Sequence, residues 1–265
     1  MRLAALLILL ALLAPPANAQ TQEVDLELVL MVDVSRSMTP NELEIQRRGY
    51  AAALRSEAVY AAVRSGLLQN VAMTYIEWAG TQEVIVDWRL LATREDLDAF
   101  ATTLTAKFDP TLRRTSISEA LLFGAARIRN NQFEGLRKVI DVSGDGPNNM
   151  GRPVTLARDA VLGEGIVING LPLLTREGMG MNWHLDHLDI YYRTCVTGGP
   201  GSFVIPVLDW EDFEAAVRRK LVLEIAGLTP PLEPIPVQAL VRDPTDCLIG
   251  EKIWQDLRRD YIFEP

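Results

Sequence analysis

The pattern of apolar and polar residues along the chain predicts a series of strands and helices. The clearest strand is the run at 24–32 (VDLELVLMV), which ends abruptly in the polar segment DVSRSM. An apolar run of this length is typical of a central strand that is covered on both faces. Residues 71–78 and 82–88 are two strand-like runs joined by a short turn at 79–81, so 82–88 is expected to be an antiparallel edge strand. The runs that predict further strands are 71–78, 82–88, 136–143, 166–174 and 203–208.

Capping residues predict the helices between these strands. Thr39, Pro40 and Glu42 supply an N-cap, a proline at the first helical position and a glutamate three residues after the cap, so a helix should run from here to about residue 63. The other helices are expected from 93, at 116–128, at 153–162, near 183–195 and at 209–226. This alternation predicts an α/β fold, namely a doubly wound, Rossmann-like, mostly parallel six-stranded sheet with one antiparallel edge strand and helices on both faces.

The first 19 residues have the features of a secretory signal peptide. Arg2 precedes an apolar run of about 12 residues, too short to span a bilayer, and the run is followed by two prolines and the small-residue triplet at 17–19. We expect cleavage before Gln20 and a periplasmic or secreted protein. An uncleaved anchor is the alternative. No later segment is apolar for long enough to predict a membrane span in the mature protein.

The end of the chain differs in composition from the rest. Residues 229–236 (TPPLEPIP) are too rich in proline for a helix or a central strand, and a short amphipathic stretch surrounds Trp254. We therefore expect a domain at 20–226 and a C-terminal extension, 227–265, that is docked on it. Cys195 and Cys247 are the two cysteines of the chain, and in an oxidising compartment they are expected to form a disulfide that tethers the extension.

The charge of the chain argues against two classes of partner. There are 26 lysines and arginines against 35 aspartates and glutamates, which gives a net charge of −9. An acidic surface disfavours binding to nucleic acid and to anionic lipid.

Hydroxyl and carboxylate groups gather at one predicted edge of the sheet. Asp33, Ser35 and Ser37 alternate directly after the first strand, so an extended loop would direct all three side chains to the same side. Oxygen ligands of this kind suit a hard cation such as Mg²⁺. Two further loops, carrying Thr115 and Asp145, should open on the same edge, where open α/β sheets bind ligands.

These segments resemble a known site. DVSRSM after the first strand, the threonine of RRTSISEAL and the aspartate-glycine pair in VIDVSGDG are similar to the three segments of the metal-ion-dependent adhesion site in von Willebrand factor A domains. The resemblance covers about 22–226. The first segment is specific when it follows an apolar strand, whereas the other two are informative only in this order and spacing. The chain also resembles an exported bacterial family of unassigned function within that superfamily.

The resemblance implies a ligand set and a mode of action. It makes Asp33, Ser35, Ser37 and Thr115 ligands of Mg²⁺ or Mn²⁺, with Asp145 a ligand directly or through water. It also implies that the open coordination position takes an acidic side chain from a partner protein or peptide, and that the domain binds without catalysing a reaction. The alternative is that these residues are ordinary loop and cap residues.

Two features depart from the family pattern. Arg113 and Arg114 stand where the family often has glycines, and they either favour an acidic partner or form a solvated rim. Asp141 lies four residues before Asp145, and a buried aspartate needs a partner. It could support the ligands or replace Asp145 among them.

Other functions have weaker support. His184 and His187 could bind zinc with Asp186 or Asp189, or could simply be solvated. Ser143 lacks the glycine two residues earlier that a nucleophile elbow requires, and the chain has no phosphate-binding glycine loop. The alternatives to a binding module are a Mg²⁺-assisted hydrolase or phosphoryl-transfer enzyme with Asp141 as general base, or a structural domain with a vestigial site.

Overall fold

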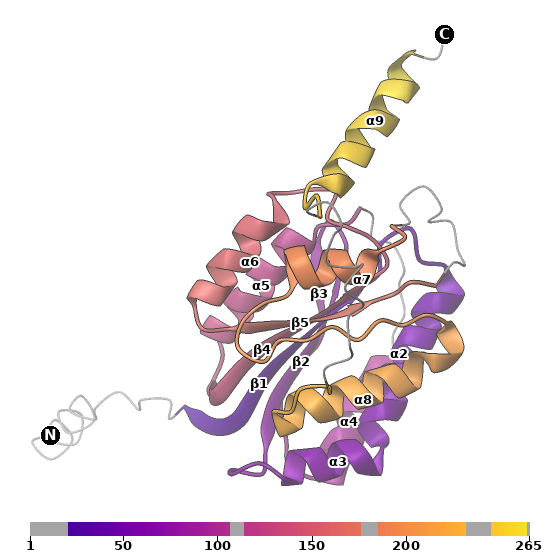
Figure 1. Ribbon diagram of the computed structural model, residues 1–265. Helices are drawn as coiled ribbons and strands as arrows, with labels where there is room; N and C mark the ends of the chain where they lie inside the picture. The colour runs from indigo at the N-terminus through magenta and orange to yellow at the C-terminus, as the bar shows by residue number, and fades with distance from the viewer. Residues whose placement is uncertain (1–20, 107–113, 176–184, 232–244, 264–265) are drawn as a thin grey trace, which may run out of the picture.

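The computed structural model describes residues 21–106, 114–175, 185–231 and 245–263, and these form a central sheet between two layers of helices (Figure 1). The sheet order is β3-β2-β1-β4-β5. Strand β1 is parallel to both its neighbours, β5 is parallel to β4, and β3 is antiparallel to β2 at the edge, as the sequence predicts. The strands are β1 (Gln22–Asp33), β2 (Val71–Trp78), β3 (Gln82–Leu91), β4 (Phe133–Gly144) and β5 (Val167–Pro172).

Strand β1 supplies side chains to two separate hydrophobic cores. From Val24 to Asp33 every residue of β1 is buried, because alternate side chains point to opposite faces and both faces carry helices. Leu28 packs in the core on one face and Val29 in the core on the other. The first face is covered by α2 (Pro40–Arg55), α3 (Glu57–Arg64), α4 (Arg94–Thr105) and α8 (Phe213–Ala226), and the second by α5 (Ile117–Arg129), α6 (Val154–Gly163) and α7 (Leu188–Tyr191).

The predicted sixth strand at 203–208 is the main error in the predicted fold. This segment runs beside β5 and makes two isolated parallel bridges, Gly170 to Val204 and Leu173 to Val207. Pro206 lies between the two bridges and has no backbone N–H to continue the ladder. The fold class is confirmed, with five strands in place of six.

The predicted helices are present, with changed limits. The first is divided at Ser56, whose hydroxyl accepts a hydrogen bond from the Val59 N–H and so starts α3. The stretch predicted near 183–195 is described only from residue 185, where α7 continues into the π-helix Tyr192–Val196, and a 3₁₀ turn, Trp210–Asp212, precedes α8.

The last helix, α9 (Ile249–Phe263), is longer than the amphipathic stretch that the sequence predicts. Its first turn lies against the domain and its remainder projects outward (Figure 1). Among the described residues, no helix has the length and hydrophobicity needed to cross a membrane. The predicted signal peptide and most of the proline-rich run lie outside the described residues.

Candidate metal centre

The loop after β1 brings two of the predicted hydroxyl ligands together. The Ser35 N–H donates to Asp33 Oδ1 over 2.7 Å, and the Met38 N–H donates to the Ser35 carbonyl over 3.0 Å. The loop is therefore extended only as far as Ser35 and then turns, which corrects the prediction of an extended segment through residue 37. The turn still leaves the hydroxyl oxygens of Ser35 and Ser37 2.9 Å apart.

Asp145 joins this pair from the loop after β4. The Ser37 hydroxyl donates to Asp145 Oδ1 over 2.8 Å. Because β1 and β4 are parallel neighbours, their carboxyl ends open on the same edge of the sheet. Hydrogen bonds thus connect Asp33, Ser35, Ser37 and Asp145 in one group at this edge.

Asp33 is a buried carboxylate with one unsatisfied oxygen. Its side chain is fully buried, and Oδ2 has no hydrogen-bond partner among the described residues. The neighbouring Gly144 leaves space beside this atom, because a Cβ at that position would lie 2.8 Å from Oδ2 and 2.9 Å from the Tyr192 hydroxyl. An unpaired buried charge is costly, so this oxygen requires a cation or a proton.

Burial and neighbouring negative charge disfavour the charged form of both carboxylates of the group. Burial raises the pKa of Asp33 well above its ordinary value, and the nearby charge of Asp145 raises it further, while hydrogen bonds from Ser35 partly offset both effects. Burial also raises the pKa of Asp145 to about 6, against the lowering effect of the Ser37 hydroxyl. The region is thus an electronegative, desolvated group of oxygens.

Thr115 lies at the edge of this group, just before α5. Its N–H donates to the Asn149 side chain over 3.3 Å, and its carbonyl accepts from the Asn149 N–H over 3.1 Å. Thr115 and Ser37 line the same pocket. Within the described part of the chain no hydrogen bond joins Thr115 to Asp33, Ser35 or Asp145.

An asparagine that the sequence analysis did not single out fixes this loop. Asn148 Oδ1 accepts from the Ser118 N–H over 3.0 Å and so caps α5. Ser116, the predicted cap, makes no capping bond, and its hydroxyl donates to the Met150 carbonyl over 3.0 Å. A side chain from a neighbouring loop thus accepts the hydrogen bond of a free backbone N–H in the first turn of α5. No local capping rule could predict this contact.

Asp141 forms an ion pair with Lys220 of α8 and not with the group around Asp33. Its Oδ1 lies 2.6 Å from Lys220 Nζ, and the same ammonium pairs with Glu224 one turn further along α8. All three side chains are buried. Burial raises the pKa of Asp141 and raises that of Glu224 to about 7, against the opposing effect of Lys220 on both. The i,i+4 spacing of Lys220 and Glu224 was visible in the sequence, but their burial was not.

The alternative zinc site is only partly described. His184 lies outside the described residues, and His187 is exposed. In the described ranges no three or more His, Cys, Asp or Glu residues are placed to hold a metal ion. The candidate centre is of another kind, because three of its five predicted ligands are hydroxyl groups.

Comparison with known proteins places the chain in a family. The model of a family described as a protein of unknown function, DUF1194, matches residues 23–229. The chain belongs to the DUF1194 family. No curated protein sequence matches it.

Solved structures share the fold of this DUF1194 chain. The pilus adhesin SpaC from Lactobacillus rhamnosus GG matches with a TM-score of 0.56 at 13% identity, over 76% of this chain and 30% of that one. Proximal thread matrix protein 1 from the mussel byssus matches with a TM-score of 0.53 at 13% identity, over 77% of this chain and 49% of that one. An aerotolerance-related membrane protein from Bacteroides fragilis matches with a TM-score of 0.51 at 19% identity, over 74% of this chain and 98% of that one.

These likenesses establish the fold of the DUF1194 chain, which is von Willebrand factor A-like. This chain spans about half the length of the mussel protein. A further structure of that protein has a zinc-occupied metal-ion-dependent adhesion site, and it matches with a TM-score of 0.51 at 14% identity, over 77% of this chain and 48% of that one.

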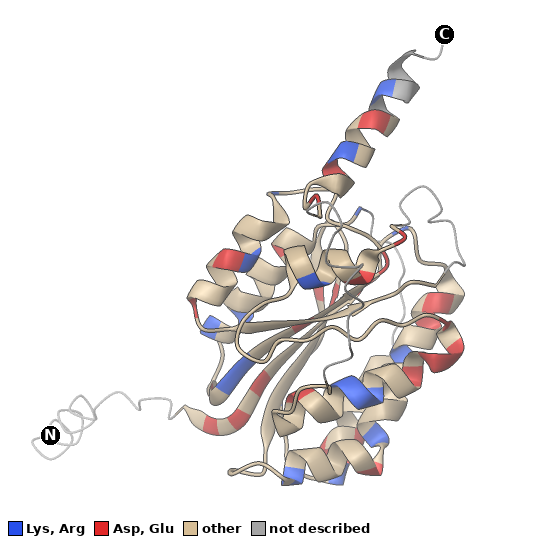
Figure 2. Cartoon of the chain, in the orientation of Figure 1, with Lys and Arg blue, Asp and Glu red and all other residues tan. Residues whose placement is uncertain are grey.

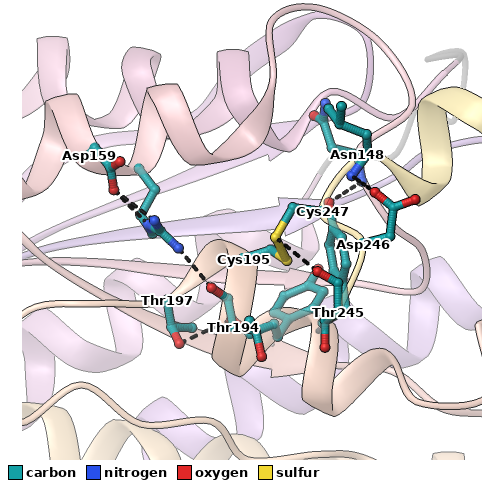
Figure 3. Close-up of a disulfide and its surroundings, with 12 residues drawn as sticks. Asn148, Asp159, Thr194, Cys195, Thr197, Thr245, Asp246 and Cys247 are labelled. Carbon is teal, nitrogen blue, oxygen red and sulfur yellow. Dashed lines mark hydrogen bonds and ion pairs between the residues drawn. A yellow bond between two sulfur atoms is a disulfide. The ribbon is translucent and has the colours of Figure 1, made fainter. Parts of the chain in front are cut away.

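The disulfide predicted from the cysteine count is present. Cys195 in the π-helix is bonded to Cys247, which precedes α9 (Figure 3). Beside it, the Asn148 side chain donates to Glu251 Oε1 of α9 over 2.7 Å. The start of α9 in this DUF1194 chain therefore contacts the loop after β4, in which Asn149 is hydrogen-bonded to Thr115.

Proposed function

We propose that this DUF1194 chain is a metal-ion-dependent module that binds a protein or peptide in the periplasm or outside the cell. The observation that carries the proposal is Asp33 Oδ2, a fully buried carboxylate oxygen without a partner among the described residues. It belongs to a group of hydroxyl and carboxylate oxygens at the carboxyl edge of a parallel sheet, where ligands bind in open α/β folds.

The donor set fits a hard divalent cation. Such ions take oxygen ligands, and Mg²⁺ usually retains some water. Mg²⁺ or Mn²⁺ would supply here an electrophilic position that accepts a carboxylate oxygen. The residues that would hold the ion are Asp33, Ser35, Ser37, Thr115 and Asp145.

The chain's own residues prepare this site. Gly144 leaves the space beside Asp33 that a larger residue would fill. The Gln46 side chain donates to the Asp33 carbonyl over 3.0 Å and so ties the end of β1 to α2. With at most two carboxylates among the ligands, the set leaves a divalent ion in need of another anionic oxygen, which an acidic partner residue can supply.

A binding function is favoured over catalysis by the position of Asp141. The hydrolase alternative needs a general base beside the ion, and Asp141 was the candidate. Its carboxylate instead pairs with the buried ammonium of Lys220 on α8, and none of the hydrogen bonds that connect Asp33, Ser35, Ser37 and Asp145 involves it. We therefore infer a binding role without a chemical step.

The proposed compartment agrees with the disulfide. Cys195 and Cys247 are bonded, and disulfides persist mainly in oxidising environments. This agreement supports the signal peptide expected at 1–19.

The test is capture of a partner under metal control. The mature chain, immobilised and exposed to periplasmic extract of its source cell, should retain a protein with Mg²⁺ and release it with EDTA. The Asp33→Asn variant should retain nothing above background, whereas Asp209→Asn, an exposed aspartate without a capping bond, should behave as wild type. Capture that is equal with Mg²⁺ and with EDTA would contradict the proposal.

A further inference from the structure

A pocket of about 410 Å³ adjoins the candidate metal centre. Ser37 and Thr115, two of the proposed ligands, form part of its wall. Its size lies within the range of roughly 300–1,000 Å³ that is usual for ligand sites. The other residues of the wall are Arg36, Arg114, Asn149, Met150 and Trp254.

The pocket is positively charged in a protein that is acidic overall. Arg36 and Arg114 bring two guanidinium groups to it, and neither forms an ion pair with a carboxylate of the described residues. Acidic and basic residues are otherwise interspersed over the helices (Figure 2), and the net charge is −9. Two arginines without carboxylate partners beside a metal centre favour a ligand with more than one negative charge.

Contacts with Met150 and Trp254 position Arg114, which lies just before α5. Arg114 adopts φ 73°, a left-handed conformation that is uncommon for a residue other than glycine. Its Nη1 donates to the Met150 sulfur over 3.4 Å, and its guanidinium lies 5.7 Å from the centre of the Trp254 ring. A stacked guanidinium keeps its outer N–H groups available to an anion.

The C-terminal extension supplies one wall of the pocket. Trp254 lies on α9, and α9 begins two residues after Cys247 of the disulfide. Gly250 approaches the loop so closely that a Cβ there would lie 2.1 Å from the Asn148 carbonyl oxygen. The wall is thus held covalently and by close packing against the loop that carries Asn149.

We propose that this pocket is the specificity site for an acidic peptide segment that carries two carboxylates. One carboxylate reaches the ion at the end of the pocket formed by Ser37 and Thr115, and the second pairs with Arg36 and Arg114. The aliphatic part of the segment packs on Trp254 and Met150. This inference rests on the proposed function, and it adds the class of ligand and a role for the extension.

The test measures peptide binding to the mature chain by calorimetry in the presence of Mg²⁺. The probes are alanine-based pentapeptides with blocked termini, in which two glutamates are separated by zero, one or two residues. Each has a matched peptide with one glutamate replaced by glutamine. At least one peptide with two glutamates should bind about tenfold more tightly than its match, because a charge-assisted hydrogen bond contributes about 1.5–3 kcal/mol.

Variants assign this preference to the pocket. Arg36→Gln and Arg114→Gln should each reduce the preference for two glutamates to about threefold or less, compared at Mg²⁺ concentrations that saturate each variant. Arg64→Gln, a change at an exposed arginine at the end of α3, should leave the preference unchanged. Trp254→Ala should weaken both members of a peptide pair, and Trp254→Phe should restore most of the loss. Circular dichroism of each variant checks that it is folded.

The outcomes separate this inference from the proposed function. If the peptides bind only with Mg²⁺ but no pair shows a preference for two glutamates, the second carboxylate site is wrong and metal-dependent recognition stands. If Trp254→Ala binds every peptide as wild type does, the extension is not part of the site. If the wild-type chain does not bind Mg²⁺, the proposed function itself is wrong.

Discussion

The hydroxyl of Ser37 donates a 2.8 Å hydrogen bond to Oδ1 of Asp145, which lies 108 residues further along the chain. The contact exists because β1 and β4 are adjacent in the sheet and end at the same edge. It connects the loop after β1 to the loop after β4 and completes the line of oxygens that begins at Asp33.

Removing the charge of Asp33 should abolish metal binding. Asp33→Asn keeps the size of the side chain but removes the anionic ligand, so Mg²⁺ affinity measured by calorimetry should fall by more than about 100-fold, given that even residues supporting a ligand can be worth 10–100-fold. Asp209→Asn serves as the exposed control. Equal Mg²⁺ binding by wild type and Asp33→Asn would show that the ion is held elsewhere.

Removing a neutral ligand should have a smaller effect. Thr115→Val keeps the shape of the side chain and removes the hydroxyl, so Mg²⁺ affinity should fall by about tenfold, since one charge-assisted contact of about 1.5–3 kcal/mol is lost and water can partly replace it. Ser37→Ala should act similarly. If Thr115→Val has no effect on Mg²⁺ affinity, Thr115 is not a ligand, which would agree with its lack of a hydrogen bond to the other proposed ligands.

Removing the disulfide should destabilise the chain without removing the metal site. Cys195 and Cys247 are 52 residues apart, and the chain-entropy relation assigns about 4 kcal/mol to a cross-link of this length. Urea unfolding of the Cys195→Ala/Cys247→Ala variant should show a loss of this order relative to the oxidised wild type. An unchanged unfolding midpoint would mean that the extension contributes nothing to stability through the bond.

Lys220 should be essential for the stability of the core. Lys220→Met leaves Asp141 and Glu224 buried without their shared cation, and loss of one partner of a buried pair costs about 3–5 kcal/mol. Adding Asp141→Asn and Glu224→Gln should recover much of the loss in chemical denaturation. Lys252→Met is the control, because Lys252 pairs with Asp246 at the surface, where an ion pair contributes at most about 1 kcal/mol.

Glu224 should make stability depend on pH. Its pKa is about 7 in the folded chain, above the ordinary 4.5, through burial and the charge of Asp141. The folded state therefore binds this proton more tightly than the unfolded state does. The stability that Glu224 contributes in this way is complete below about pH 4.5 and is lost as pH rises through about 7. Lys220 and Asn169 also face Glu224, and Arg137 donates to its backbone carbonyl.

The measurement is the difference between Glu224→Gln and wild type in the free energy of unfolding. Relative to wild type, the variant should gain stability between pH 5 and pH 8, by on the order of 1–3 kcal/mol, since one pKa unit corresponds to about 1.4 kcal/mol. Other titrating groups are common to both proteins and largely cancel in this difference. A difference that is flat across this range would mean that Glu224 has an ordinary pKa.

Local patterns in the sequence predicted most of the fold. The buried β1, the β2–β3 hairpin and the capped start of α2 follow from apolar runs and capping residues, which act over a few neighbouring positions. The sixth strand was wrong because an apolar run does not reveal whether its ladder continues past Pro206. The predicted cap of α5 was wrong because the capping hydrogen bond comes from Asn148, which is 30 residues away from Ser118.

The sequence by itself determined the order of strands and helices and the residue types of the candidate centre, since both depend on periodicity and on short segments. Only the tertiary structure decided which side chains meet. Asp141 and Asp145 lie on the same strand-to-loop segment, but Asp141 faces Lys220 of α8 whereas Asp145 faces Ser37. The pocket beside the site includes Trp254 because a disulfide places α9 there. Contacts between segments so distant in the chain depend on how strands and helices pack, which no local pattern records.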